Sequence, residues 1–211
     1  TEWLHGFLMD PQPLRPAVVM RMPNFYMTSD EARNLVNYFA AKSDAEWPYE
    51  YNSRRRDGYL ASLESAHPTR FDDAMKIVTD GNYCVKCHSV GDFQPKGAIK
   101  TQGPQLAEAY QRLRADYVRN WVANPKRILP YTGMPVNIPY QDQGPHFGGV
   151  AQDLFPGTSV EQLDAVVDLL MNFDEYARRQ TDIKSMVREA PPEGEQAATE
   201  PRNDQSAATA R

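Results

Sequence analysis

Apolar side chains recur every three or four positions in three segments of the chain between residues 69 and 180. This spacing places them on one face of an α-helix, so we expect helices at about 69–80, 115–123 and 159–178. The apolar positions are Phe71, Met75 and Val78 in the first segment, Tyr117, Val118, Trp121 and Val122 in the second, and Leu163, Val166, Val167, Leu170 and Phe173 in the third.

Residues of known capping preference mark the ends of these segments. Thr69 is the expected N-cap of the first helix, and Thr158 or Ser159 is the expected N-cap of the last. The middle helix is expected to stop at Asn124-Pro125, because a residue before proline disfavours helical backbone. The three helices are therefore predicted from periodicity and from their ends.

The bulk composition excludes several classes of protein. The 211 residues are 41% hydrophobic and 24% charged, which is ordinary for a globular chain. The net charge of −5, without a basic stripe, argues against a nucleic-acid partner. No stretch approaches the roughly 20 apolar residues of a transmembrane helix. Residues 1–20 lack the pattern of a signal peptide, and with Thr1 in first place we expect a processed or excised part of a longer protein.

Two cysteines occur, and they form the sequence Cys84-Val85-Lys86-Cys87-His88. A zinc ribbon would need a second Cys or His pair, and a thioredoxin-like dithiol would need a βαβ setting; neither is visible. Cys-x-x-Cys-His is the attachment sequence of c-type haem, in which two thiols on one turn bind the vinyl groups and the histidine binds the iron. We therefore predict one covalent haem c on Cys84 and Cys87, with His88 as an iron ligand.

A six-coordinate haem needs a second axial ligand, and Met134 is the best candidate. It lies in Gly133-Met134-Pro135, within a Pro- and Gly-rich loop that is expected to be non-helical. Thioether sulfur is a soft ligand that raises the reduction potential relative to a second histidine. Met75 and Met171 lie on predicted helices and are expected to be core residues. His146, in a long loop, is expected to be an exposed histidine rather than a ligand.

The segment from about 68 to 180 resembles a class I cytochrome c. The resemblance is carried by the attachment motif, Gly103-Pro104-Gln105-Leu106, Asn124-Pro125, Leu129-Pro130 and Gly133-Met134-Pro135. It implies an all-α fold wrapped around one haem, and it implies that the Pro104 carbonyl accepts a hydrogen bond from His88 and so fixes its tautomer. Tyr117 and Trp121 are expected to be core residues rather than haem contacts.

A second, partial copy of this pattern begins the chain. Residues 4–16 match residues 118–130 at a constant offset of 114, and Met22-Pro23 resembles Met134-Pro135 after a two-residue insertion. Residues 1–42 therefore resemble the C-terminal half of a second cytochrome c domain, with Met20 as the weaker candidate for its methionine. Either the haem-bearing half lies upstream in a longer di-haem protein, which we prefer, or the first domain has decayed.

The expected organisation is a partial domain at 1–42, a polar linker at 43–66, a cytochrome c domain at 67–182 and a polar, disordered tail at 183–211. Arg54-Arg55-Arg56 in the linker is expected to be solvated, and the alternative is a docking patch for an acidic partner or a haem propionate. Trp3, Leu4, Phe7, Phe25 and Phe39 are expected to pack against a partner or another domain.

The expected function is outer-sphere electron transfer and not catalysis. The expected partners are redox proteins, including other subunits of a membrane-associated respiratory or dehydrogenase assembly, and the expected location is the periplasm or another extracytoplasmic face of a bacterium. Two alternatives remain open: a haem enzyme or gas sensor with an open iron position, and a structural interaction subunit.

Overall fold

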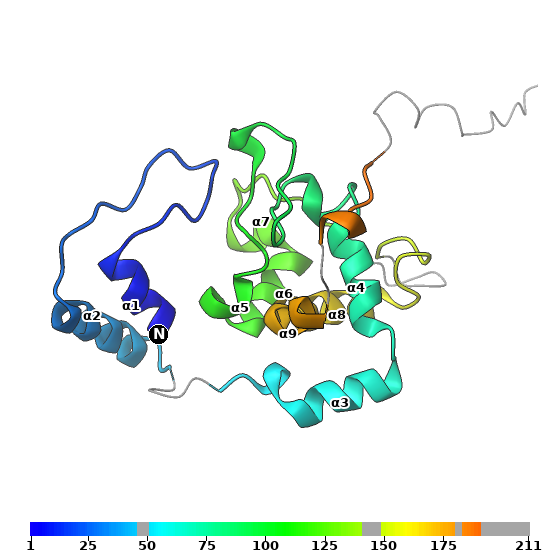
Figure 1. Ribbon diagram of the computed structural model, residues 1–211, viewed down its shortest axis with the longest axis horizontal. Coiled ribbons are helices and arrows are strands. Elements are labelled where there is room, and N and C mark those ends of the chain that lie inside the picture. The colour runs from blue at the N-terminus through cyan, green and yellow to red at the C-terminus, as the bar shows by residue number, and fades with distance from the viewer. Residues whose placement is uncertain (46–50, 141–148, 180–182, 191–211) are drawn as a thin grey trace, which may run out of the picture.

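The computed structural model describes residues 1–45, 51–140, 149–179 and 183–190, and this part of the chain is mostly helical (Figure 1). The only β-structure among these residues is three isolated bridges. The helices, with 3-10 turns labelled η, are α1 (Glu2–Met9), α2 (Ser29–Lys42), η1 (Ser53–Arg55), α3 (Asp57–Ala66), α4 (Arg70–Thr79), η2 (Cys84–Lys86), η3 (Ile99–Thr101), α5 (Ala109–Arg112), α6 (Ala115–Ala123), α7 (Pro125–Ile128), α8 (Ser159–Met171), α9 (Phe173–Arg179) and η4 (Lys184–Met186). The all-α prediction agrees with this content.

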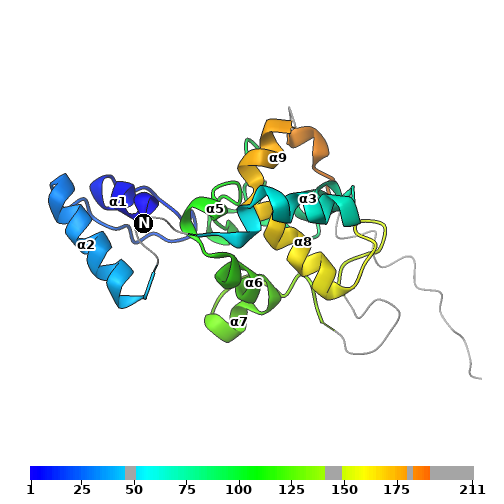
Figure 2. The ribbon, with the colours of Figure 1, turned by 90° about the horizontal axis from the view of Figure 1, so that it is seen from below.

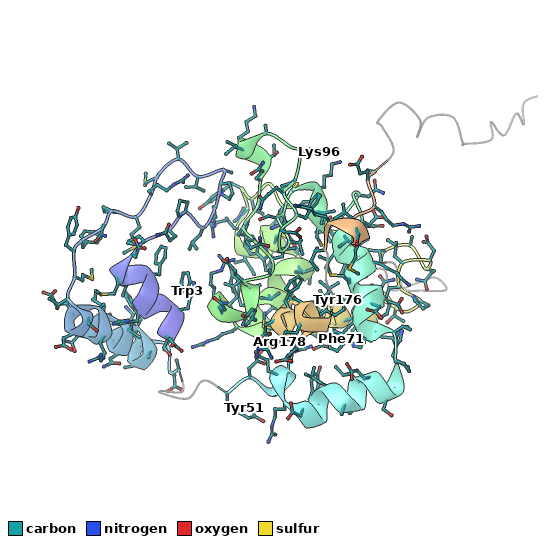
Figure 3. The ribbon with its side chains drawn as sticks, viewed as in Figure 1. Trp3, Tyr51, Phe71, Lys96, Tyr176 and Arg178 are labelled. Carbon is teal, nitrogen blue, oxygen red and sulfur yellow. The ribbon has the colours of Figure 1, made fainter. Side chains whose placement is uncertain are left out.

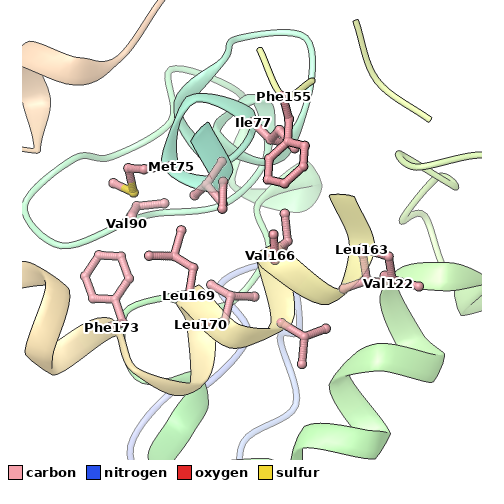
Figure 4. Packing of buried hydrophobic residues seen from close by; sticks show 14 of the residues in the cluster. Met75, Ile77, Val90, Val122, Phe155, Leu163, Val166, Leu169, Leu170 and Phe173 are labelled. Atoms are coloured by element: carbon pink, nitrogen blue, oxygen red, sulfur yellow. The ribbon is translucent and has the colours of Figure 1, made fainter. Parts of the chain in front are cut away.

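Helix α8 is the centre of the larger unit, and α4 and α6 both pack on it. Ten of its thirteen residues are buried. Leu169 on α8 and Met75 and Ile77 on α4 are fully buried, and Figure 4 shows them in one cluster. Full burial of each such side chain contributes about 1.5–3 kcal/mol of hydrophobic stabilisation. Met75 and Met171 have no exposed surface, so the prediction that both are core residues is confirmed.

The predicted helix ends need three corrections or refinements. Thr158, and not Ser159, is the N-cap of α8. Thr69 occupies the N-cap position of α4 but makes no capping bond, because its hydroxyl donates to Asp73 Oδ2 at 2.7 Å instead. The single helix expected over 159–178 is interrupted at Asn172, whose side-chain amide donates to two backbone carbonyls and so competes with helical geometry.

Residues 53–66 are not a solvated linker. They form η1 and α3, and two of the three arginines are anchored on the larger unit. Arg54 Nη1 donates to Asp168 Oδ1 at 2.6 Å, and Arg55 binds both carboxylate oxygens of Asp174 at 2.8 and 2.9 Å. Arg56 lies over the Tyr51 ring, 5.3 Å from its centroid. The prediction failed because carboxylates more than 100 residues away in sequence attract these arginines.

The boundary predicted at 183 is also wrong, since residues 183–190 pack against the segment that precedes the cysteines. Arg188 N donates to Thr79 O at 3.0 Å, and Gly81 N donates to Arg188 O at 2.6 Å. Ile183 is buried against the main core. The packed unit therefore extends to Ala190, and the rest of the predicted tail lies outside the described residues.

Helices α1 and α2 form a small pair with its own cluster, in which Leu8, Ala32 and Val36 are buried, and α1 also contacts α5 of the larger unit. Figures 1 and 2 show this pair at one side of the larger unit, joined by a long loop over residues 10–28. Within the part of the chain that the structure describes, no helix combines the length and apolar character needed to cross a bilayer.

Candidate functional site

The two cysteines lie on one tight turn between α4 and the following loop. Cys87 N donates to Cys84 O at 3.2 Å and His88 N donates to the same oxygen at 2.9 Å, so η2 brings residues 84, 87 and 88 together. Both cysteines are free thiols. Burial raises the pKa of the Cys84 thiol to about 12. The thiols are therefore not paired with each other, and each has its sulfur available for a covalent bond.

His88 is held in one orientation by the loop that carries Pro104. Its Nδ1 donates to the Pro104 carbonyl at 2.8 Å, which is the hydrogen bond that the resemblance implies. Burial lowers the pKa of His88, while the bond to the carbonyl raises it, and the net shift is downward. With Nδ1–H engaged, Nε2 of the neutral ring carries the lone pair that a metal would bind.

Gly103 makes this approach possible. Gly103 N donates to Cys87 O at 2.7 Å, so the backbones of the two segments run side by side. A Cβ on Gly103 would lie 2.6 Å from His88 Nδ1 and 2.8 Å from its Nε2, inside van der Waals contact. Only glycine leaves room for the imidazole at this position.

Gln105 ties the loop that carries Pro104 to the backbone of Gly91, a role that the sequence pattern did not predict. Its Oε1 accepts from Gly91 N at 3.0 Å and its Nε2 donates to Gly91 O at 2.9 Å. Leu106 N also donates to Ser89 O at 2.9 Å. Gln105 was visible as the residue after Gly103-Pro104, but its partner depends on a fold that periodicity does not describe.

Met134 is placed by Trp121 and its own loop. Trp121 Nε1 donates to Met134 Sδ at 2.9 Å, and Met134 N donates to Thr132 Oγ1 at 3.3 Å. Met134 packs against the edge of the main core. Trp121 was expected to be plain core filler; it is half-buried and acts as a hydrogen-bond donor to the sulfur. Tyr117 stacks on it, with ring centroids 6.0 Å apart, and is 40% exposed.

The hydrogen bonds of the described residues join His88 to Pro104 and Met134 to Trp121, and none joins His88 to Met134. Cys84 and Met134 both border the same core cluster. The donor set of two thiols, an oriented imidazole and a thioether fits a c-type haem.

The two other histidines that the structure describes, His5 and His67, do not build a competing site. His67 Nε2 lies 3.0 Å from Asp73 Oδ2, and His5 Nε2 lies 3.1 Å from Ser29 O. His146, the alternative ligand considered above, falls outside the described residues. In the described parts of the chain, no three His, Cys, Asp or Glu side chains gather as a metal cluster.

No protein-family model, curated protein or solved structure matches this chain.

Proposed function

We propose that the chain is a c-type cytochrome that transfers electrons through one covalent haem. The observation that carries the proposal is the Cys-x-x-Cys-His turn whose His88 donates through Nδ1 to the Pro104 carbonyl, which leaves Nε2 for iron. In this proposal Cys84 and Cys87 would hold the haem as thioethers, and His88 and Met134 would bind its iron. Bound haem would supply an iron that accepts one electron and passes it on.

The residues of the chain supply orientation and an apolar border to the site. The Pro104 carbonyl keeps the His88 ring fixed and makes it a better electron donor. Trp121 fixes Met134 Sδ on a loop that the backbone alone would leave less constrained. Cys84 is partly buried against the main core, so apolar residues border this side of the site. With both axial positions filled, no position is left for a substrate, which is why we propose a carrier and not an enzyme.

Partners and location follow from the same chemistry. An outer-sphere carrier needs a donor and an acceptor protein, so we place it among the redox subunits of a membrane-associated respiratory or dehydrogenase assembly. Cysteine pairs are used for such covalent chemistry in oxidising compartments, so we place the protein on the extracytoplasmic side of a bacterial membrane.

Covalent attachment is tested by replacing both thiols. The double variant C84A/C87A is expected to lose the haem when the protein is denatured, whereas K86A, which changes the exposed residue between them, is expected to keep it. Denaturing electrophoresis with haem stain and intact mass provide the measurement. Absence of covalent haem from the unmodified protein, produced with the haem-attachment machinery, would rule out the proposal.

Ligation by Met134 is tested separately. Met134→Ala is expected to abolish the weak far-red absorption of ferric, methionine-ligated haem and to lower the reduction potential. Met20→Ala, at a methionine that is 85% exposed, is the matched control and is expected to change neither. A high-spin spectrum of the unmodified protein, with CO binding to the reduced form without loss of a ligand, would instead indicate an open iron position and an enzyme or sensor.

A further inference from the structure

Helix α1 is a structural copy of helix α6. Trp3 and Phe7 stack with centroids 5.0 Å apart and planes at 14°, and Tyr117 and Trp121 stack at 6.0 Å and 18°. The two pairs are related by the sequence offset, since 117 − 3 and 121 − 7 both equal 114. The residue after each helix also matches: its backbone lies at φ −141°, ψ 85° after α1 and φ −157°, ψ 85° after α6.

Helix α2 is likewise a copy of the start of α8. Both begin with a complete capping box, Thr28 with Glu31 and Thr158 with Glu161. The Thr backbone N–H donates to the Glu carboxylate at 2.8 Å in the first and 2.7 Å in the second. In both, the Glu backbone N–H donates to the Thr hydroxyl at 3.3 Å. The pairing of α1 with α2 also parallels the pairing of α6 with α8.

The two copies differ in what covers the second helix. Helix α8 is covered by α6 and also by α4, the helix that leads into the cysteine motif. Asp168 and Leu169 of α8 have no exposed surface. Their equivalents at an offset of 158 − 28 = 130 are Tyr38 and Phe39, which are 57% and 47% exposed. Helix α2 is therefore covered on the α1 side and bare on the side where α8 meets α4.

Part of the loop between α1 and α2 is exposed as well. Val19, Phe25 and Tyr26 are 92%, 58% and 88% exposed. Figure 1 shows this loop arching away from α1, and Figure 3 shows it with its side chains. We call these three residues, together with Tyr38 and Phe39, the open face. A small unit that exposes this much apolar surface is expected to bury it against another polypeptide.

We infer that the open face is the docking site of the haem-bearing half of a second cytochrome domain, supplied by the same polypeptide ahead of Thr1. In the larger unit, α4 covers the corresponding side of α8, and the Cys-x-x-Cys-His turn follows α4. We expect the docked half-domain to supply an equivalent helix and turn. Because the motif histidine of the larger unit is residue 88 and the offset is 114, the second motif histidine lies 88 − 114 = −26, which is about 27 positions before Thr1.

Met22 is the methionine that this second haem receives. It precedes Pro23 as Met134 precedes Pro135, and it packs against the small cluster as Met134 packs against the large one. Met20, which aligns without a gap, points into solvent and touches neither cluster. The inference rests on the proposed function, because the larger unit serves as the template for a haem-binding domain.

Counting haem peptides tests the inference. The protein purified from the cells that make it is digested, and haem-carrying peptides are sequenced by mass spectrometry. Two are expected: one with Cys84 and Cys87, and one with a second Cys-x-x-Cys-His upstream of Thr1. A haem peptide from Cys84 and Cys87 alone, or a second haem on a separate polypeptide, would overturn it. A haem peptide from upstream alone would overturn the function proposed for Cys84 and leave this inference standing.

The assignment of Met22 has its own test in the same full-length protein. In a C84A/C87A background only the second haem remains, so its spectrum is read in isolation. Met22→Ala is expected to remove the far-red band of the ferric form and to lower the potential, whereas Met20→Ala leaves both unchanged. Retention of the band in the Met22 variant, or its loss in the Met20 variant, would overturn the assignment. Circular dichroism shows whether each variant keeps its helices.

Discussion

At the scale of single residues, two hydrogen bonds define the site, and each orients one of the two proposed ligand side chains. Pro104 fixes the imidazole of His88 through a backbone carbonyl, and Trp121 fixes the thioether of Met134 through its indole N–H. Neither partner is itself a proposed ligand. Their effect is to hold nitrogen and sulfur lone pairs in place before any metal arrives, and outer partners of this kind tune the ligand that they hold.

Trp121→Phe tests the second of these bonds. An N–H donated to sulfur withdraws electron density and favours reduced iron, so its loss is expected to lower the reduction potential. If the hydrogen bond contributes a net free energy of about 0.5–1 kcal/mol, its loss corresponds to a decrease in the one-electron reduction potential of roughly 20–40 mV. Redox titration measures the change. Tyr117→Phe, which removes a hydroxyl from the stacked partner ring and keeps the ring itself, is the control and is expected to leave the potential unaltered.

At the scale of elements, buried charge attaches η1 and α3 to α8. Asp168, with no exposed surface, accepts from Arg54 at 2.6 Å, from Arg70 at 2.8 Å and from the Tyr59 hydroxyl at 3.0 Å. Desolvation raises the pKa of Tyr59, and the neighbouring Asp168 raises it further. A fully desolvated carboxylate needs all of these donors. The packing of α8 therefore depends on η1 and α3, and their position depends on Asp168.

Asp168→Asn is expected to destabilise the protein by about 3 kcal/mol, because it leaves two partly buried guanidinium groups facing a neutral amide. Asp164→Asn is the matched control on the same helix. Its side chain is 28% exposed and receives Arg54 and Arg119, so a loss of about 1 kcal/mol or less is expected. Denaturant unfolding followed by circular dichroism compares the two, and equal losses would contradict the role given to Asp168.

The Arg55–Asp174 ion pair, which joins η1 to α9, makes the stability of the protein depend on pH. The hydrogen bond from Arg55 lowers the pKa of Asp174 below its ordinary value of 3.8, against the opposing effect of burial. The stabilisation is thus complete above about pH 4 and is lost as the pH falls through the lowered pKa. Arg55→Met is expected to remove up to about 1 kcal/mol at neutral pH and less in acid.

Unfolding measured across the acid range provides the test. Arg178→Met is its control, because Arg178 pairs with Glu175 at the surface, where both side chains are largely exposed. That variant is expected to change stability little at any pH. A loss in the Arg55 variant that does not shrink on acidification would show that the pair is not the source.

At the scale of the whole molecule, the end of the packed region closes over the segment that leads into the cysteines. Residues 183–190 bond to Thr79 and Gly81, Ile183 is buried, and Lys96 pairs with Glu189. The chain thus forms one unit from η1 to Ala190, with the α1–α2 pair beside it.

A chain that ends at residue 182 is expected to be about 2–4 kcal/mol less stable than one that ends at residue 190. It loses the burial of one isoleucine and two backbone hydrogen bonds. The chain ending at 190 is the control and retains every one of these contacts. Denaturant unfolding of the two gives the difference, and equal midpoints would show that residues 183–190 do not stabilise the unit.

The sequence alone indicated α4, α6 and the start of α8, because apolar periodicity is a local property of neighbouring residues, and so is the capping box at Thr158. It also indicated the tight turn that brings residues 84, 87 and 88 together, because these residues are adjacent in sequence, and it revealed the repeat between residues 4–16 and 118–130. It did not reveal that Arg54 and Arg55 are anchored, that Trp121 donates to Met134, or that residues 183–190 pack onto Thr79. Those contacts join positions that are distant in sequence, or that lie on loops without periodicity.

The same division applies to the two halves of the repeat. The sequence showed that residues 1–42 resemble part of a domain, yet only the tertiary structure showed which faces are covered. Tyr38 and Phe39 look like ordinary members of an amphipathic helix, and they are exposed because no helix of the described segments covers them as α4 covers α8. Burial depends on which elements are present to pack, and that is decided by the assembled fold and not by the pattern of any one helix.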